Sequence, residues 1–163
     1  MSESYAVRVS KDYLVFCAGH FISYEGDKCE RLHGHNYRVA VEVQHTLDEN
    51  HYVFDFIALK NMTKGITDEL DHRMLLPMHN PHIRVAKEAE SVRVTYRERE
   101  WRFPAGDCLL LPIANTTAEL LARWIGERLL RDLQVERGFR PNVLCIEVEE
   151  SFGQSAKWKW CGS

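Results

Sequence analysis

The sequence predicts an α+β domain in which antiparallel strands pack against two helices. Three observations support this fold class: strand-like alternation near both ends of the chain, two stretches with helical spacing between them, and 163 residues with a hydrophobic share of 45%. Such a length and composition are typical of one domain with an adequate core. We therefore expect a single domain over residues 1–163, with the element order β, β, α, insert, α, β, β.

The first two strands are expected over residues 5–16 and 35–44, and the last two over residues 142–150 and 156–160. Side chains alternate across a strand, so every second residue shares a face. In the second strand the apolar residues share one face and the polar residues share the other, which indicates a half-buried antiparallel pair. The apolar face holds Tyr37, Val39, Val41 and Val43, and the polar face holds Arg38, Glu42 and Gln44.

The first helix is expected from Asp55, which could cap it, to about Leu70. The second helix is expected to start near Thr116 or Thr117 and to end before Gly138. In both stretches the apolar residues recur at helical spacing, so each helix would bury one stripe. The stripes are Phe56, Leu59, Met62, Ile66 and Leu70 in the first helix, and Leu120, Leu121, Trp124, Ile125 and Leu129 in the second.

The stretch between the helices, from about residue 77 to about residue 112, is expected to be an insert. Residues 91–96 and 101–103 alternate as a β-hairpin, and an apolar segment over residues 109–112 follows. We expect the hairpin arginines to lie on a solvated face, with contact to a phosphate as the alternative. These arginines are Arg93, Arg97, Arg99 and Arg102.

Charge and hydropathy exclude several classes of function. The formal net charge is −3 and the charges are mixed, so no basic stripe indicates nucleic acid. The opening from Met1 to Tyr5 is polar and no segment is long and apolar enough to span a membrane, so we expect a cytoplasmic protein. Five cysteines without a Cys-x-x-Cys pair predict reduced thiols, of which only Cys29 lies in a polar loop.

Three histidines close in sequence form a candidate metal site. His33 and His35 are two residues apart, so both project from one face of a strand. His20 ends an earlier strand, and antiparallel pairing would bring it to the other two. Three nitrogen ligands leave one position of a zinc ion open, which is typical of a catalytic site. Cys29 is either a fourth ligand that closes a structural site or the reacting thiol, and spacing alone does not separate these roles.

The motifs together resemble the 6-pyruvoyltetrahydropterin synthase family, and most of all its 6-carboxy-5,6,7,8-tetrahydropterin synthases of 7-deazaguanine (queuosine) biosynthesis. The resemblance spans most of the chain and rests on six motifs in order. These are Phe16–His20, Cys29–Tyr37 with its Cys-x-x-x-His-Gly-His spacing, Asp55–Phe56, Leu70–His72, Thr117–Glu119 and Val148–Ser151.

This resemblance implies a tunnelling fold (T-fold), in which an antiparallel four-stranded sheet carries two helices on one face, here with an inserted β-hairpin. It also implies trimers that stack as homohexamers. The implied reaction is the zinc-dependent conversion of 7,8-dihydroneopterin triphosphate to 6-carboxy-5,6,7,8-tetrahydropterin by a lyase. The implied metal ligands are His20, His33 and His35, the catalytic residues are Cys29, Asp71 and His72, and the pterin-binding residues are Glu150, Thr117 and Glu119.

Glu30, directly after Cys29, departs from the carboxy-type pattern. Subgroups with Cys-Glu-x-x-His-Gly-His, or with glutamate in place of the cysteine, are linked to cleavage of dihydroneopterin side chains to 6-hydroxymethyl-7,8-dihydropterin in the folate branch. Glu30 is therefore a second candidate base, and side-chain cleavage or pyruvoyltetrahydropterin synthesis is the alternative reaction. A non-catalytic zinc- and pterin-binding protein is the alternative of another class, although the intact Cys29, Asp71 and His72 weigh against it.

Overall fold

Two long antiparallel strands form the centre of the fold. In the computed structural model, which describes residues 3–162, β1 (Tyr5–His20) pairs with β4 (His33–His45) along almost its whole length. Both strands extend beyond the expected ranges, and the added residues include His20 and His33, whereas His35 was already in the expected range. Met1, Ser2 and Ser163, which the single-domain expectation includes, lie outside the described residues.

A β-bulge in β1 changes which residues face the core. The register with β4 shifts between Ser10 and Val15. Val9 is buried before the shift, whereas Phe16 and His20 are buried after it. The buried face therefore moves from odd-numbered to even-numbered positions, and it ends in a histidine.

The main sheet has six strands in the order β11-β10-β4-β1-β5-β9. β10 (Val143–Ser151) and β11 (Gln154–Cys161) complete the expected four antiparallel strands. β5 (Arg73–Pro77) and β9 (Cys108–Leu111) run parallel to β1 on its other side. The expectation of a four-stranded sheet was therefore incomplete, because it lacked β5 and β9. β5 has no alternation because it is buried on both faces, so its sequence gives no strand period.

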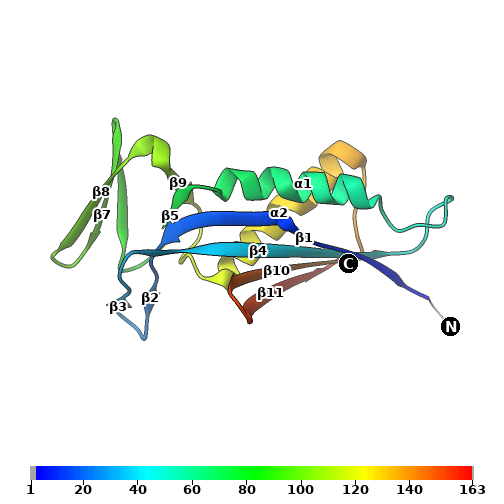
Figure 1. Ribbon diagram of the computed structural model, residues 1–163, viewed down its shortest axis with the longest axis horizontal. Helices are drawn as coiled ribbons and strands as arrows, with labels where there is room; N and C mark the ends of the chain where they lie inside the picture. The colour runs from blue at the N-terminus through cyan, green and yellow to red at the C-terminus, as the bar shows by residue number, and fades with distance from the viewer. Residues whose placement is uncertain (1–2, 163) are drawn as a thin grey trace.

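Both helices pack on one face of the sheet (Figure 1). α1 (Phe56–Leu70) begins after Asp55, whose side chain accepts a backbone N–H of the first turn at 2.6 Å. α2 (Ala118–Arg137) begins after Thr117, whose hydroxyl caps it, and ends at Gly138 with φ of 61°. These caps match the sequence prediction. Neither helix in residues 3–162 is long and apolar enough to cross a membrane.

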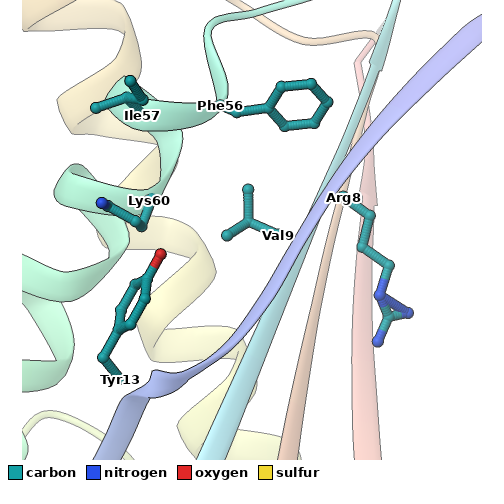
Figure 2. Close-up of a pocket in the computed structure, with 6 residues that line it drawn as sticks. All are labelled: Arg8, Val9, Tyr13, Phe56, Ile57 and Lys60. Atoms are coloured by element: carbon teal, nitrogen blue, oxygen red, sulfur yellow. The ribbon is translucent and has the colours of Figure 1, made fainter.

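Phe56, which was expected in the buried stripe of α1, is instead 58% exposed. As the first helical residue it lines, together with Ile57 and Tyr13, an apolar depression of about 350 Å³ (Figure 2). This depression lies over the N-terminal half of β1, far along the strand from His20. The rest of the stripe is buried or half-buried as expected.

The insert forms a three-stranded antiparallel sheet at one end of the molecule (Figure 1). β7 (Ser91–Tyr96) and β8 (Arg99–Pro104) are the expected hairpin, but β6 (Arg84–Glu88) adds a third strand. A short 3₁₀ helix (Ala105–Asp107) then leads into β9, which belongs to the main sheet. A second apolar core lies against this insert, formed by Phe21, Met74, Leu76, Ile83, Val92, Val94 and Tyr96.

A short hairpin connects the two halves of the central pair. β2 (Ser23–Tyr24) pairs with β3 (Lys28–Cys29) across a turn at Glu25 and Gly26, both of which have positive φ. Glycine adopts this conformation without the steric cost that other residues bear. The hairpin returns the chain from the end of β1 to the start of β4.

The close packing of α2 on the sheet depends on Gly126. A β-carbon at this position would lie 2.2 Å from the ring of Trp158 on β11 and 3.1 Å from Ile146 on β10. Gly65 is the matched position in α1, where an added β-carbon meets nothing within 4 Å.

We expect Gly126→Ala to destabilise the protein by about 1–3 kcal/mol, because overpacking outweighs the gain in helix propensity. Gly65→Ala should instead stabilise it by about 0.5–1 kcal/mol, since that site is open. Urea unfolding of both variants measures these changes. Equal stabilisation by the two substitutions would contradict the packing of α2 described above.

Candidate metal and pterin site

Three imidazoles converge where β1 and β4 end. His20 lies opposite His33 in the register, and His35 lies opposite Ala18 on the same face. The ring centroid of His20 lies 4.8 Å from that of His33 and 5.2 Å from that of His35. One nitrogen from each ring lies within 4.8 Å of the other two. The grouping predicted from the sequence is therefore present, and we refer to it as the histidine cluster.

Backbone carbonyls orient two of these imidazoles. Nδ1 of His20 lies 2.9 Å from the carbonyl oxygen of Thr116, and Nδ1 of His33 lies 2.8 Å from that of Arg31. A carbonyl oxygen only accepts hydrogen bonds, so Nδ1 carries a proton in each ring, and in the neutral form of the ring Nε2 keeps a free lone pair. Metal-binding histidines are commonly fixed in this way.

The burial of His20 fits a metal ligand. His20 is 1% exposed, and its Nε2 has no hydrogen-bond partner among residues 3–162. Burial lowers the pKa of His20 to about 4, the Thr116 carbonyl opposes this shift, and His33 and His35 add to it. The ring is therefore neutral near pH 7, and its buried lone pair is available. The three imidazole nitrogens of the cluster match the donor set of a zinc ion or of another first-row metal ion.

The two candidate bases point in different directions. Oε2 of Glu30 lies 3.9 Å from Nε2 of His33 and accepts the N–H of Ile22 at 3.2 Å. The Cys29 side chain instead packs against the second core, and its thiol lies 3.5 Å from the carbonyl oxygen of Glu30. Burial raises the pKa of the Cys29 thiol, Arg99 lowers it, and Glu30 raises it further. Cys29 is not part of the histidine cluster within residues 3–162, so the geometry does not support a closed site with four protein ligands.

A pocket of about 310 Å³ opens beside the cluster and contains all three predicted pterin contacts: Thr117, Glu119 and Glu150. Oε1 of Glu150 lies 3.5 Å from Nε2 of His20 and 3.8 Å from Nε2 of His35, so this carboxylate belongs to both features. The hydroxyl of Thr117 accepts a backbone N–H of α2 at 3.4 Å. Thr117 therefore has a structural role as the helix cap as well as a place in the pocket.

Asp71 and His72 form a hydrogen-bonded pair just before β5. Nδ1 of His72 lies 2.8 Å from Oδ2 of Asp71, and the N–H of Cys17 donates to Oδ1 at 2.7 Å. The Cys17 N–H, and then His72, lower the pKa of Asp71 against the opposing effect of burial. The side chain of His72 is 81% exposed. In the described part of the chain, no hydrogen bond or ion pair links His72 to the histidine cluster, so its catalytic role stays a prediction.

Sequence reasoning missed two residues at the site. Thr116 is fully buried, orients His20 through its carbonyl group, and donates its hydroxyl to the carbonyl of Phe21 at 3.4 Å. The Tyr37 ring lies 5.8 Å from that of His20 and 5.5 Å from that of His35, and its buried hydroxyl has no hydrogen-bond partner in the described part of the chain. Burial, with Glu150 and Glu30, raises the pKa of Tyr37, so the phenol stays neutral. The two-residue period from His35 was a signal for Tyr37, whereas nothing local in the sequence links Thr116 to His20.

The expected solvated face is confirmed for Arg93, Arg97 and Arg102, whose side chains are 42%, 57% and 54% exposed, but not for Arg99, which is half-buried. Arg93 and Arg102 pair with Glu88 on the exposed side of the insert. Arg97 pairs with Asp27 in the β2–β3 turn, and Arg99 contacts the chain just before the histidines. The hairpin alternation could not distinguish these cases because the partners of Arg97 and Arg99 lie in a different part of the sequence.

Comparison with known sequences identifies relatives across the length of the chain. Residues 8–159 match the family described as 6-pyruvoyl tetrahydropterin synthase. The chain is 30% identical over 154 residues to a putative 6-carboxy-5,6,7,8-tetrahydropterin synthase from Methanocaldococcus jannaschii, covering 94% of this chain and 90% of that protein. It is 40% identical over 143 residues to the dihydroneopterin monophosphate aldolase of Pyrococcus furiosus, covering 88% and 91% of the two chains.

Solved structures give the same result for the fold. The 6-pyruvoyl tetrahydropterin synthase of Plasmodium falciparum superposes with a TM-score of 0.91 at 29% identity, covering 98% of this chain and 99% of that one. A Plasmodium vivax 6-pyruvoyltetrahydropterin synthase, in which a glutamate described as catalytic is replaced by alanine, superposes with a TM-score of 0.90 at 27% identity and the same coverage. The T-fold expectation is confirmed, and the chain belongs to the 6-pyruvoyl tetrahydropterin synthase family of pterin-processing enzymes.

Proposed function

We propose that this protein is a metal-dependent lyase that cleaves the side chain of a 7,8-dihydroneopterin phosphate to 6-hydroxymethyl-7,8-dihydropterin, with Glu30 as the base. One observation carries the proposal: the Glu30 carboxylate lies 3.9 Å from Nε2 of His33, whereas the Cys29 thiol packs against the second core. The sequence alone favoured a Cys29-dependent carboxy-type enzyme. The orientation of the two side chains moves our preference to the cleavage reaction.

Two relatives support this choice. The Pyrococcus furiosus protein with 40% identity is a dihydroneopterin monophosphate aldolase, and an aldolase breaks a carbon–carbon bond beside a hydroxyl group. The Plasmodium vivax synthase has a glutamate that is described as catalytic. Both are consistent with a carboxylate base in this family. Neither relative fixes the physiological substrate of this chain.

Different residues of the site would bind the metal ion and the pterin. His20, His33 and His35 would hold a zinc ion through Nε2, and zinc would supply Lewis acidity to the side-chain hydroxyls of the substrate. Glu150 would bind the pterin edge, because a carboxylate can accept the amino and ring N–H groups side by side. Glu119 and Thr117 line the same pocket, so they would flank the pterin ring.

The chemical step would be a retro-aldol cleavage. Glu30 would accept the proton of a side-chain hydroxyl while the adjacent carbon–carbon bond breaks and a carbonyl group forms. The electron pair of that bond would pass into the conjugated pterin ring, and a proton would then return to the carbon that stays attached. His72, oriented by Asp71, is our candidate for this second proton transfer, since imidazole readily exchanges protons near neutral pH.

A second candidate is the zinc-dependent formation of 6-carboxy-5,6,7,8-tetrahydropterin from 7,8-dihydroneopterin triphosphate with Cys29 as the base. The Methanocaldococcus jannaschii relative, which carries that name, favours it. This reaction would require the Cys29 thiol to leave the second core and ionise despite its burial. The sequence also left open a pyruvoyl synthase and a non-catalytic binding protein, and the product experiment below separates them.

We also propose that the chain works in the cytoplasm as a homo-oligomer, either a trimer or a dimer of trimers. The outer edge of β11 has no partner strand within the described chain. An unpaired sheet edge exposes backbone donors and acceptors, which pairing with another copy would satisfy.

Replacement of Glu30 should separate the two reactions. We expect Glu30→Gln to lower the rate of 6-hydroxymethyl-7,8-dihydropterin formation at least about 100-fold, because general-base catalysis contributes about 10²–10⁴-fold. Cys29→Ser should keep that activity within about threefold of wild type. The measurement is mass spectrometry of every pterin formed from 7,8-dihydroneopterin monophosphate and triphosphate by the zinc-loaded protein.

Glu149→Gln is the matched control, because Glu149 lies next to Glu150 in sequence but on the opposite face of β10. Loss of a 6-carboxytetrahydropterin product only in Cys29→Ser would establish the second candidate instead. A wild-type protein that yields no pterin product from either substrate would contradict both reactions and favour a binding role.

Removal of one histidine should remove the metal. We expect His33→Ala to lower the zinc content from about one ion per chain to near zero, since two imidazoles hold a catalytic zinc weakly. His45→Ala is the control, because His45 ends the same strand far from the cluster. Metal analysis of the dialysed proteins measures this, and stoichiometric zinc in His33→Ala would reject the ligand assignment.

Without metal, the protein should lose stability as the pH falls from about 6.5 towards about 4. Histidine in an unfolded chain has a pKa of about 6.5, whereas the pKa of folded His20 is about 4. In this window the unfolded chain binds a proton that the folded chain does not, so the free energy of unfolding decreases by up to about 3 kcal/mol. Urea unfolding of chelator-treated protein measures the slope. His20→Gln should flatten it, and a parallel profile in that variant would contradict the assignment.

A further inference from the structure

One arginine of the insert holds the peptide group that joins the two candidate bases. Nη1 of Arg99 donates to the carbonyl of Cys29 at 3.2 Å, and Nη2 donates to the carbonyl of Glu30 at 3.0 Å. A guanidinium is planar, with its donors in a fixed fork, so two such bonds restrict rotation of the chain between the two acceptors. A lysine ammonium is a point charge without this geometry.

Aromatic rings fix the position of Arg99 itself. Its guanidinium lies 4.6 Å over the ring of Trp101 and 6.0 Å from that of Tyr96, both on the insert. The Trp101 ring stacks on Phe21 with centroids 4.5 Å apart and an interplanar angle of 26°. Phe21 directly follows His20 at the end of β1. The stack therefore connects the arginine to the strand that carries the first histidine.

Glu30 is restrained at its other polar groups as well. Its N–H donates to the carbonyl of Ile22 at 3.0 Å, and its carboxylate accepts the N–H of Ile22 at 3.2 Å. Because Arg99 donates to the carbonyl of Glu30, all three polar groups of this residue have hydrogen-bond partners: the N–H, the carbonyl and the side chain. Successive side chains of an extended segment point to opposite sides. Holding this segment in place therefore directs the Cys29 thiol to the second core and the Glu30 carboxylate to the histidines.

The other insert arginines have different contacts. Arg97 pairs with Asp27, at the far end of the β2–β3 hairpin. Arg102 lies on the same strand as Arg99, but its described hydrogen bonds go to Glu88 and Ser91, both within the insert. Among the four arginines, Arg99 is the one whose described hydrogen bonds reach the candidate bases.

We propose that Arg99 is a positioning residue that selects Glu30 over Cys29 as the base at the histidine cluster. The insert thereby determines which pterin product the site forms. This inference rests on the proposed function for its chemical consequence, whereas the ordering of residues 22–30 by Arg99 does not depend on any activity.

The test compares Arg99→Met, Arg99→Lys and the control Arg102→Met in the full-length, zinc-loaded protein. Methionine keeps an unbranched side chain of similar length against Trp101 but donates no hydrogen bond. Hydrogen exchange of the backbone amides, followed by mass spectrometry, should be about tenfold faster over residues 22–30 in Arg99→Met and unchanged in Arg102→Met, because each lost bond came from a charged donor.

Kinetics on 7,8-dihydroneopterin monophosphate give the second measurement. Arg99→Met should lower kcat about 10–100-fold with KM within about threefold and zinc content unchanged, since a displacement of about 1 Å can reduce a rate 10²-fold. The share of any 6-carboxytetrahydropterin formed from the triphosphate should rise. Arg99→Lys should recover part of kcat, because one carbonyl regains a charged donor.

The inference would be overturned by wild-type exchange over residues 22–30 in Arg99→Met, by wild-type kcat and products in that variant, or by an equal loss of kcat in Arg102→Met. Loss of zinc in parallel with activity would also reject it, because Arg99 does not contact the cluster. If the wild-type protein forms no pterin product, the proposed function fails. Faster exchange confined to residues 22–30 would then still support the ordering role of Arg99.

Discussion

The antiparallel pairing of β1 with β4 is the constraint on which the site depends. Its register places His20 opposite His33, and the two-residue period continues the same face through His35 and Tyr37. A slip of one residue would move the β4 histidines to the opposite face of the sheet. The bulge in β1 is equally necessary, because without the shift His20 would lie on the face away from the helices. The hydrophobic core that holds the sheet against the helices therefore also fixes the geometry of the cluster.

Neither of the two candidate bases, Cys29 and Glu30, belongs to the larger apolar core. Cys29 packs against the core of the insert, whereas Glu30 turns towards the histidines at the end of the main sheet. The two neighbouring side chains thus experience different surroundings, one apolar and one polar. The surroundings of Cys29 and Glu30 therefore differ because of the insert, which packs beside them although it lies about seventy residues away in the sequence.

Local patterns were sufficient to predict the four antiparallel strands, both helices with their caps, and the grouping of the histidines. Alternation, capping residues and spacing are properties of neighbouring residues, so one sequence carries them. The exposed Phe56, the strand β5 and the contacts of Arg99 could not be predicted, because each depends on segments that meet only in the folded chain. The same holds for Thr116 and His20, which are 96 residues apart.

The backbone at His72 has φ of 56°, a left-handed conformation that costs most residues about 1–2 kcal/mol. The turn is required because α1 ends at Leu70 and β5 begins at Arg73. Glycine would satisfy this turn with less strain. A sequence optimised for thermostability alone would therefore place glycine at this position and remove the imidazole. This chain instead has a side chain that is conformationally less favourable, and the proton transfer that we propose for His72 would account for it.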